Sequence, residues 1–182
     1  MPTKKYVWYA CYGSNLDEKR FLCYIDGKNR KIFGIPMTDK GCTDKTPPIK
    51  NIPFKIPYSL YFAKNSKKWG GAVAFIDHNE NGVDYSFGRA WLITEEQFRE
   101  VNKQEGKNYL KKIDLGHHEN YPVKTFTNKN SMTNQILENN SPSEKYLNTI
   151  RRGLKKTYPK MKEEEIEVYL NRAKCRKHEV LR

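Results

Sequence analysis

The stretch YACYGSNL, residues 9–16, joins two segments of different character. Residues 6–12 are mostly aromatic or apolar and predict a buried strand. From Leu16 to about Ile25, apolar and charged residues follow one another with the spacing of a short helix. Gly13 lies at the joint between them. A glycine turn that opens onto a helix leaves backbone N–H groups without partners, so this joint predicts an anion-binding loop.

The two polar residues of this loop have two possible uses. Ser14 or Asn15 can serve as the N-cap of the following helix, since both side chains accept a hydrogen bond from a helical N–H. Ser14 does not fit the nucleophile elbow G-x-S-x-G, because Tyr12 and Leu16 occupy the outer positions. We therefore expect Ser14 to be a cap or a ligand donor.

Size and composition indicate an ordinary globular chain. At 182 residues and 21.5 kDa, we expect a single domain over residues 1–182. The sequence has no apolar run approaching about 20 residues, so it predicts no membrane span. Residues 1–5 lack a following apolar segment and a small-residue cleavage site, which favours a cytoplasmic protein.

The net charge of +13 raises the question of an anionic partner. The basic residues are spread along the chain, and most are lysine, whereas bidentate recognition of phosphates or bases favours arginine. A solvated basic surface is therefore preferred over nucleic-acid binding. An acidic substrate remains compatible with this charge.

The cysteines and histidines indicate neither a metal site nor a disulfide framework. Cys11, Cys23, Cys42 and Cys175 form no C-x-x-C pair. Residues 117–119, HHE, are interpreted as a loop, because adjacent side chains on an extended segment point to opposite sides. We expect no metal.

The rest of the chain predicts an α+β fold. Residues 27–53 are rich in Gly, Pro, Lys and Asp and have room for one short strand, and residues 128–140 are interpreted as a loop. The predicted strands are Tyr58–Ala63, Gly71–Ile76, Tyr85–Ile93 and Tyr121–Thr127, with a turn at residues 79–82. Three further helices are predicted: one after Thr94, one after Ser143 and one that contains Ile166. The last two are expected to pack over the sheet.

One carboxylate interrupts an apolar stripe. In the helix after Thr94, which begins with a capping box, Phe98 and Val101 lie on one face, and Glu105 follows at the same spacing before Gly106. Glu105 is either a solvated residue at a frayed end or a general base in a half-buried pocket. In the second case, desolvation would raise its pKa toward its working range.

The paired glycines Gly70 and Gly71 also allow two interpretations. A glycine pair that enters a strand indicates either a β-bulge or a close approach of the backbone to a ligand. Trp69 precedes them, and this segment is a lower-ranked candidate for the wall of a binding site.

These features together resemble the γ-glutamylcyclotransferase-like superfamily. The resemblance rests on YGSNL at the end of the first strand, on GRAWLIT at residues 88–94, on QEG at residues 104–106, and on Tyr109. It spans residues 6–127 and includes no aligned motif in residues 27–56. It implies a small mixed β-barrel or sheet with packed helices. Two helices within residues 141–182 resemble extensions of some bacterial members.

The resemblance also implies a reaction and a set of site residues. A γ-glutamyl amine or peptide would cyclise to 5-oxoproline and release a free amine, with Glu105 as general base and without a cofactor. The implied substrate-binding residues are Tyr12, Gly13, Ser14, Asn15, Leu16 and Tyr109, although Tyr109 is equally well interpreted as a core residue. The alternative is a small-ligand or protein-binding module without turnover. The sequence identifies neither the leaving amine nor the oligomeric state.

Overall fold

The computed structural model describes residues 2–79, 84–132 and 141–180. Its main element is a five-stranded mixed sheet in the order β4-β7-β1-β9-β8. The strands are β1 (Tyr6–Cys11), β4 (Asn51–Ile56), β7 (Ser86–Thr94), β8 (Lys111–His118) and β9 (Tyr121–Thr127). Most of the predicted turn at residues 79–82 and the end of the predicted loop at residues 128–140 lie outside the described residues.

Strand β1 is central because it is apolar on both faces. It pairs antiparallel with β7 and parallel with β9, and all of its residues except Tyr6 are buried. On one face, the Tyr9 ring stacks on Phe126 of β9 with centroids 4.9 Å apart. The YGSNL segment therefore leaves from the middle of the sheet.

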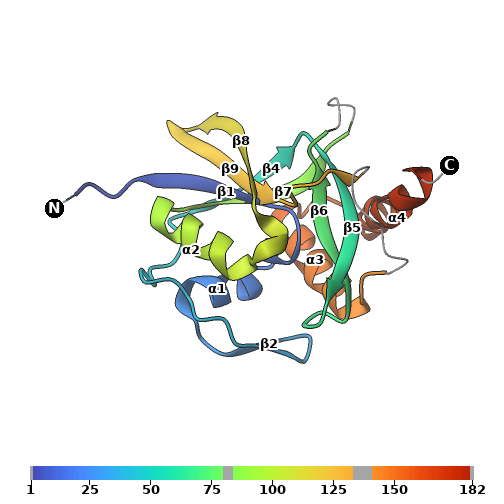
Figure 1. The fold of residues 1–182 in the computed structure, drawn as a ribbon, viewed down its shortest axis with the longest axis horizontal. Coiled ribbons are helices and arrows are strands. Elements are labelled where there is room, and N and C mark those ends of the chain that lie inside the picture. The colour runs from blue at the N-terminus through green and yellow to red at the C-terminus, as the bar shows by residue number, and fades with distance from the viewer. Residues whose placement is uncertain (1, 80–83, 133–140, 181–182) are drawn as a thin grey trace.

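In the described part of the chain, four helices and two small sheets accompany this sheet, and in Figure 1 they lie below it and to its right. The helices are α1 (Glu18–Asp26), α2 (Glu95–Glu105), α3 (Glu144–Thr157) and α4 (Glu163–Val180), with short 3₁₀ turns η1 (Ser14–Leu16) and η2 (Lys107–Tyr109). The hairpins are β2 (Arg30–Ile32) with β3 (Ile35–Met37), and β5 (Ser59–Ser66) with β6 (Gly71–Asp77). The predicted α+β class with a mixed sheet is confirmed.

Helix α1 begins later than predicted. Residues 14–16 form the turn η1, and Asp17 is the N-cap, since its side chain accepts a hydrogen bond from the Lys19 N–H at 2.9 Å. The prediction of Ser14 or Asn15 as the cap was wrong because the side chain of Asn15 is used elsewhere, as described below. The capping box at Thr94 was correct.

Several strands were missed by the sequence analysis. Residues 27–53 contain β2, β3 and the start of β4 instead of one short strand. His117 and His118 lie in β8, not in a loop, and His118 accepts a hydrogen bond from the Trp8 indole through its carbonyl. Strand β8 is largely exposed at the edge of the sheet, so its sequence lacks an apolar alternation.

The glycine pair before β6 has a structural explanation. The β5–β6 register shifts between Ala63 and Ser66, which pairs with Gly71, so a bulge is present but its extra residue lies in β5, opposite the strand that the glycine pair enters. A Cβ on Gly71 would lie 2.4 Å from the Ser141 carbonyl oxygen, so the close approach is to the chain itself and not to a ligand. This contact joins the β5–β6 hairpin to the chain that leads into α3.

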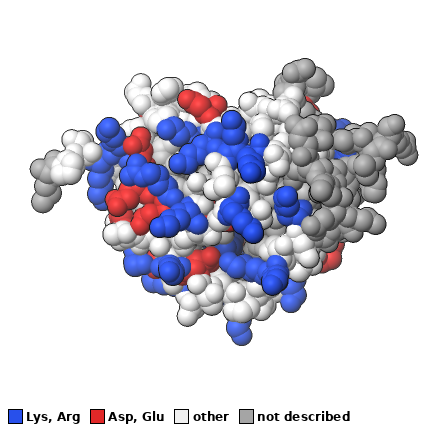
Figure 2. Space-filling model, in the orientation of Figure 1, with Lys and Arg blue, Asp and Glu red and all other residues white. Residues whose placement is uncertain are grey.

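The C-terminal helices pack on the rest of the fold. Helix α3 lies against η1, where Arg152 forms a 2.5 Å ion pair with the buried Asp17, and α4 packs against β5. None of the described helices is both long and apolar enough to cross a membrane. Figure 2 shows Lys and Arg side chains spread over one face of the molecule and interspersed with acidic ones.

Candidate functional site

A cavity of about 230 Å³ lies where the β1–η1 joint, α1, the end of α2, the β5–β6 hairpin and α3 meet. Among the residues predicted for the site, seven line it: Tyr12, Gly13, Ser14, Asn15, Trp69, Glu105 and Tyr109. Three others lie elsewhere. Leu16 is fully buried in the core. Gly70 and Gly71 belong to the β5–β6 hairpin but do not line the cavity. The volume is below the roughly 300–1,000 Å³ of pockets for drug-sized ligands, so the cavity suits a small molecule.

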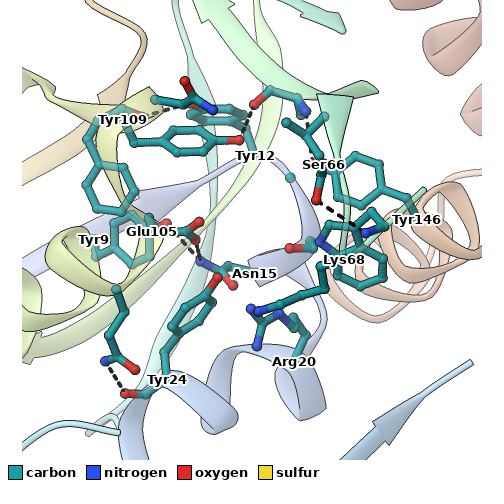
Figure 3. A pocket seen from close by; sticks show the side chains of 18 residues that line it. Tyr9, Tyr12, Asn15, Arg20, Tyr24, Ser66, Lys68, Glu105, Tyr109 and Tyr146 are labelled. Carbon is teal, nitrogen blue, oxygen red and sulfur yellow. Dashed lines mark hydrogen bonds between the residues drawn. The ribbon is translucent and has the colours of Figure 1, made fainter. Parts of the chain in front are cut away.

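Glu105 is the last residue of α2 and points into this cavity (Figure 3). One of its carboxylate oxygens accepts a 2.8 Å hydrogen bond from the Asn15 side-chain amide. Burial raises the pKa of Glu105 above its usual 4.5, although the charge of Arg20, hydrogen bonding by Asn15 and Tyr24, and the charge of Lys68 act in the opposite direction. The carboxylate therefore holds a proton more readily than a surface glutamate does.

Asn15 connects Glu105 to the core of the sheet. Its side-chain amide also donates to the Tyr9 hydroxyl at 3.1 Å, and its backbone carbonyl accepts from the Trp91 indole at 3.1 Å. The side chain is buried, and its Oδ1 has no hydrogen-bond partner among the described residues. Because the amide must face the acceptors Glu105 and Tyr9, an unused acceptor remains for a ligand donor.

The loop before Asn15 approaches α3 closely. A Cβ on Gly13 would lie 3.0 Å from the Tyr146 hydroxyl and 3.3 Å from the Ala74 Cβ, so only glycine fits here without displacing its neighbours. Tyr146 accepts a 2.9 Å hydrogen bond from the Ala74 N–H. A residue of α3 therefore forms part of the wall, which the resemblance did not imply.

Fewer loop N–H groups are available to an anion than expected. The Leu16 N–H donates to the Gly13 carbonyl and the Asp17 N–H donates to the Ser14 carbonyl, both at 3.1 Å. The N–H groups of Ser14 and Asn15 precede these turn hydrogen bonds. The Ser14 N–H also faces the Tyr146 hydroxyl, so the Asn15 N–H is the better candidate to meet a bound anion.

Two tyrosines of the predicted site hold its walls in place. The Tyr12 hydroxyl donates to the Phe126 carbonyl at 2.7 Å, and the Tyr109 hydroxyl donates to the Ala74 carbonyl at 2.9 Å. The Tyr109 ring stacks on Phe75 with centroids 4.8 Å apart. Tyr109 therefore lines the cavity and also packs on the core.

The opposite side of the cavity carries two cations that the sequence analysis missed. Arg20 of α1 is fully buried and pairs with Asp39 at 2.5 Å, and Lys68 of the β5–β6 hairpin reaches the same carboxylate at 3.3 Å. Figure 3 shows Arg20 and Lys68 together on the side away from Glu105. Burial would raise the pKa of Asp39, but the hydrogen bond and charge of Arg20, with Lys68, lower it overall.

One local signal could have identified Arg20. It lies four residues before Tyr24, so the two share a helix face, and the guanidinium sits 3.9 Å from the Tyr24 ring centroid. Lys68 has no comparable signal, because nothing in a run of hairpin lysines distinguishes the one that reaches the cavity. Among the described residues, no group of three or more His, Cys, Asp or Glu side chains could hold a metal ion.

Comparison with known proteins supports the fold. A solved structure named gamma-glutamyl cyclotransferase aligns with 91% of this chain and 87% of its own at a TM-score of 0.59 and 18% identity. A crystal structure of an uncharacterized protein from Homo sapiens aligns with 92% of this chain and 88% of its own, at a TM-score of 0.59 and 19% identity. The predicted γ-glutamyl cyclotransferase-like fold is confirmed, and the alignments include part of the C-terminal helical region.

Comparison of sequences identifies no family for the chain. No protein-family model matches the chain. Histone deacetylase 5 of Arabidopsis thaliana is 30% identical over 204 residues, which cover 92% of this chain and 30% of that protein. The chain thus spans less than a third of the length of this relative.

Proposed function

We propose that this chain, which has the fold of a solved γ-glutamyl cyclotransferase, converts a γ-glutamyl amine or peptide into 5-oxoproline and a free amine. The observation that carries the proposal is Glu105, a carboxylate of raised pKa that Asn15 holds at the wall of a small cavity. Unpaired carboxylates are rarely kept in such places for stability. A general base accounts for this one.

The proposed reaction needs a single substrate. The Glu105 carboxylate takes a proton from the α-ammonium of the γ-glutamyl group, and the freed amine attacks the γ-carbonyl carbon. A carbon–nitrogen bond forms and closes the five-membered ring, and the carbonyl oxygen becomes an oxyanion. When the oxyanion collapses, the bond to the leaving nitrogen breaks and Glu105 returns its proton to that nitrogen. The ring nitrogen loses its second extra proton to the departing amine, which leaves as an ammonium ion, so the lactam is neutral. Because nucleophile and electrophile belong to one molecule, folding it in the cavity replaces a bimolecular encounter.

The loop and Asn15 would orient the glutamyl half. The free Oδ1 of Asn15 lies beside Glu105 and can accept a hydrogen bond from the same α-ammonium. The N–H group of Asn15 can donate to the oxyanion or to a carboxylate of the substrate. Leu16 is left out of this set because its N–H is used within η1.

The test is detection of 5-oxoproline by mass spectrometry from a panel of γ-glutamyl amines, amino acids and peptides. Glu105→Gln is the decisive variant, since its amide oxygen can still accept from Asn15 while it can no longer carry the proton. We expect kcat to fall by about 10²- to 10⁴-fold. Glu96→Gln, on an exposed position of the same helix, is the matched control and should retain full turnover.

Two results would remove the proposal in different ways. Full turnover by Glu105→Gln would exclude Glu105 as the base. No 5-oxoproline from the wild type across the panel, with γ-glutamyl compounds still bound, would favour the alternative of a binding module without turnover.

A further inference from the structure

The proposed reaction assigns no role to the cationic side of the cavity. We propose that Arg20 and Lys68 form a subsite that binds a carboxylate of the ligand. The kind of ligand, a γ-glutamyl compound, rests on the proposed function, whereas the recognition of a carboxylate rests on the cavity and its cations alone.

Arg20 is the main observation. Its side chain is fully buried and lines the cavity, and its terminal nitrogens contact Asp39 at 2.5 and 3.4 Å. Its Nε has no hydrogen-bond partner among the described residues. A buried N–H of a charged group is costly to leave unpaired, and a guanidinium presents its donors as a fork that fits a carboxylate. An anionic acceptor in the cavity would satisfy this donor.

Lys68 adds a second, adjustable cation from another element. It belongs to the β5–β6 hairpin, lines the cavity and keeps 37% of its side chain exposed. Its described ion pair is the 3.3 Å contact with Asp39, so the ammonium group can turn toward a ligand without losing a tight partner. Arg20 from α1 and Lys68 from the hairpin therefore share a single carboxylate, that of Asp39.

The charges leave this side of the cavity suited to an anion. Asp39 neutralises one of the two cations, and one positive charge remains, while Glu105 supplies a negative charge on the other side (Figure 3). A ligand with an ammonium group at one end and a carboxylate at the other matches this arrangement. That carboxylate can be the α-carboxylate of the glutamyl half or a carboxylate on the leaving amine.

A purely structural role explains less of the geometry. An Arg20–Asp39 ion pair would attach α1 to the segment that contains Asp39, as buried pairs often do. It would not require Lys68 to lie at the cavity, nor would it leave the Nε of Arg20 without a partner. Recognition of a carboxylate accounts for both observations.

The first experiment measures binding and needs no turnover. 5-Oxoproline and 2-pyrrolidinone share the lactam ring and differ by the carboxylate, and calorimetric titration compares their affinities. If the subsite binds the α-carboxylate, we expect the wild type to prefer 5-oxoproline, and Lys68→Gln to reduce that preference by about fivefold. Lys67→Gln is the matched control, because Lys67 is the neighbouring exposed lysine and does not line the cavity.

The second experiment identifies which carboxylate is bound. γ-Glutamylalanine and γ-glutamylethylamine differ only by the carboxylate of the leaving amine. If Lys68→Gln binds γ-glutamylalanine more weakly than the wild type does but binds 5-oxoproline equally well, the subsite recognises the carboxylate of the leaving group. A loss of affinity for 5-oxoproline would assign it to the α-carboxylate.

Different results would contradict the carboxylate subsite and the cyclotransferase activity. If Lys68→Gln and Lys67→Gln change the affinity for every carboxylate ligand alike, or if the wild type binds none of these ligands, Arg20 and Lys68 are not a carboxylate subsite. If the carboxylate preference depends on Lys68 but no 5-oxoproline is ever formed, the subsite stands and the cyclotransferase proposal falls.

Discussion

Glu105, which lines the cavity, and Asp39, which pairs with the cations that line it, lie in opposite electrostatic settings. Glu105 has an amide neighbour and no ion pair among its described contacts, and its pKa is raised because burial prevails. Asp39 has two cationic partners, and its pKa is lowered because Arg20 and Lys68 outweigh burial. Environments that separate the pKa values of two acids also separate their roles. One carboxylate is suited to move a proton, and the other to hold cations in place.

The largest expected effect is on the Asp39 side. Asp39→Ala would leave the fully buried Arg20 without its counter-ion, and we expect the free energy of unfolding to fall by about 3–5 kcal/mol. Urea denaturation measures it. Because the pKa of Asp39 is lowered in the folded state, its stabilisation is present above the unfolded pKa and is lost as the pH falls through the folded pKa. The difference from the wild type should therefore shrink in acid.

A more exposed pair of the same kind is the control for this measurement. Asp26, the last residue of α1, pairs with Arg30 at the start of β2, and both side chains are partly accessible. Asp26→Ala should cost about 1 kcal/mol or less. Equal losses for the two variants would contradict the idea that burial distinguishes Asp39.

The next effect concerns the Glu105 side. Asn15→Leu removes the hydrogen bond to the Glu105 carboxylate, and hydrogen bonds to charged groups contribute about 1.5–3 kcal/mol, so we expect kcat/KM to fall by roughly 10- to 100-fold. Because this hydrogen bond lowers the pKa of Glu105, its loss should also move the acid limb of the pH–rate profile to higher pH. An unmoved acid limb would show that Asn15 does not act through Glu105.

The smallest effect is a gain in stability. The folded-state pKa of Glu105 is raised, so its contribution to stability is full below the unfolded pKa and is lost as the pH rises through the folded pKa. Glu105→Gln should therefore raise Tm at neutral pH, by about 2–4 °C for each kcal/mol regained. This gain should disappear below about pH 4.5, where Glu105 is neutral in both states. Differential scanning calorimetry at the two pH values checks it, and a lower Tm at neutral pH would contradict it.

The sequence predicted one half of the cavity better than the other. Gly13, Asn15 and Glu105 belong to recognisable local patterns, a glycine joint and a helical stripe, and the structure brings them together at the cavity. Arg20, Lys68 and Tyr146 were missed because they come from three elements far apart in the chain. Their convergence depends on packing, which leaves no periodic signal.

The same distinction applies to the fold. The strands with apolar runs, β1, β5, β6, β7 and β9, and the capped helix α2 were predicted within a few residues. Strand β8 and hairpin β2–β3 were missed, since edge strands and three-residue strands need few apolar residues and take their register from a partner.

By itself, the sequence determined where the first strand stops, where α2 starts and that a carboxylate continues its apolar stripe, because backbone sterics, capping and side-chain spacing act over a few residues. Tertiary structure alone decided that Asn15 meets Glu105 and that Arg20 and Lys68 share Asp39. It also decided the direction of each pKa shift, because desolvation and charge depend on neighbours that the chain brings from a distance.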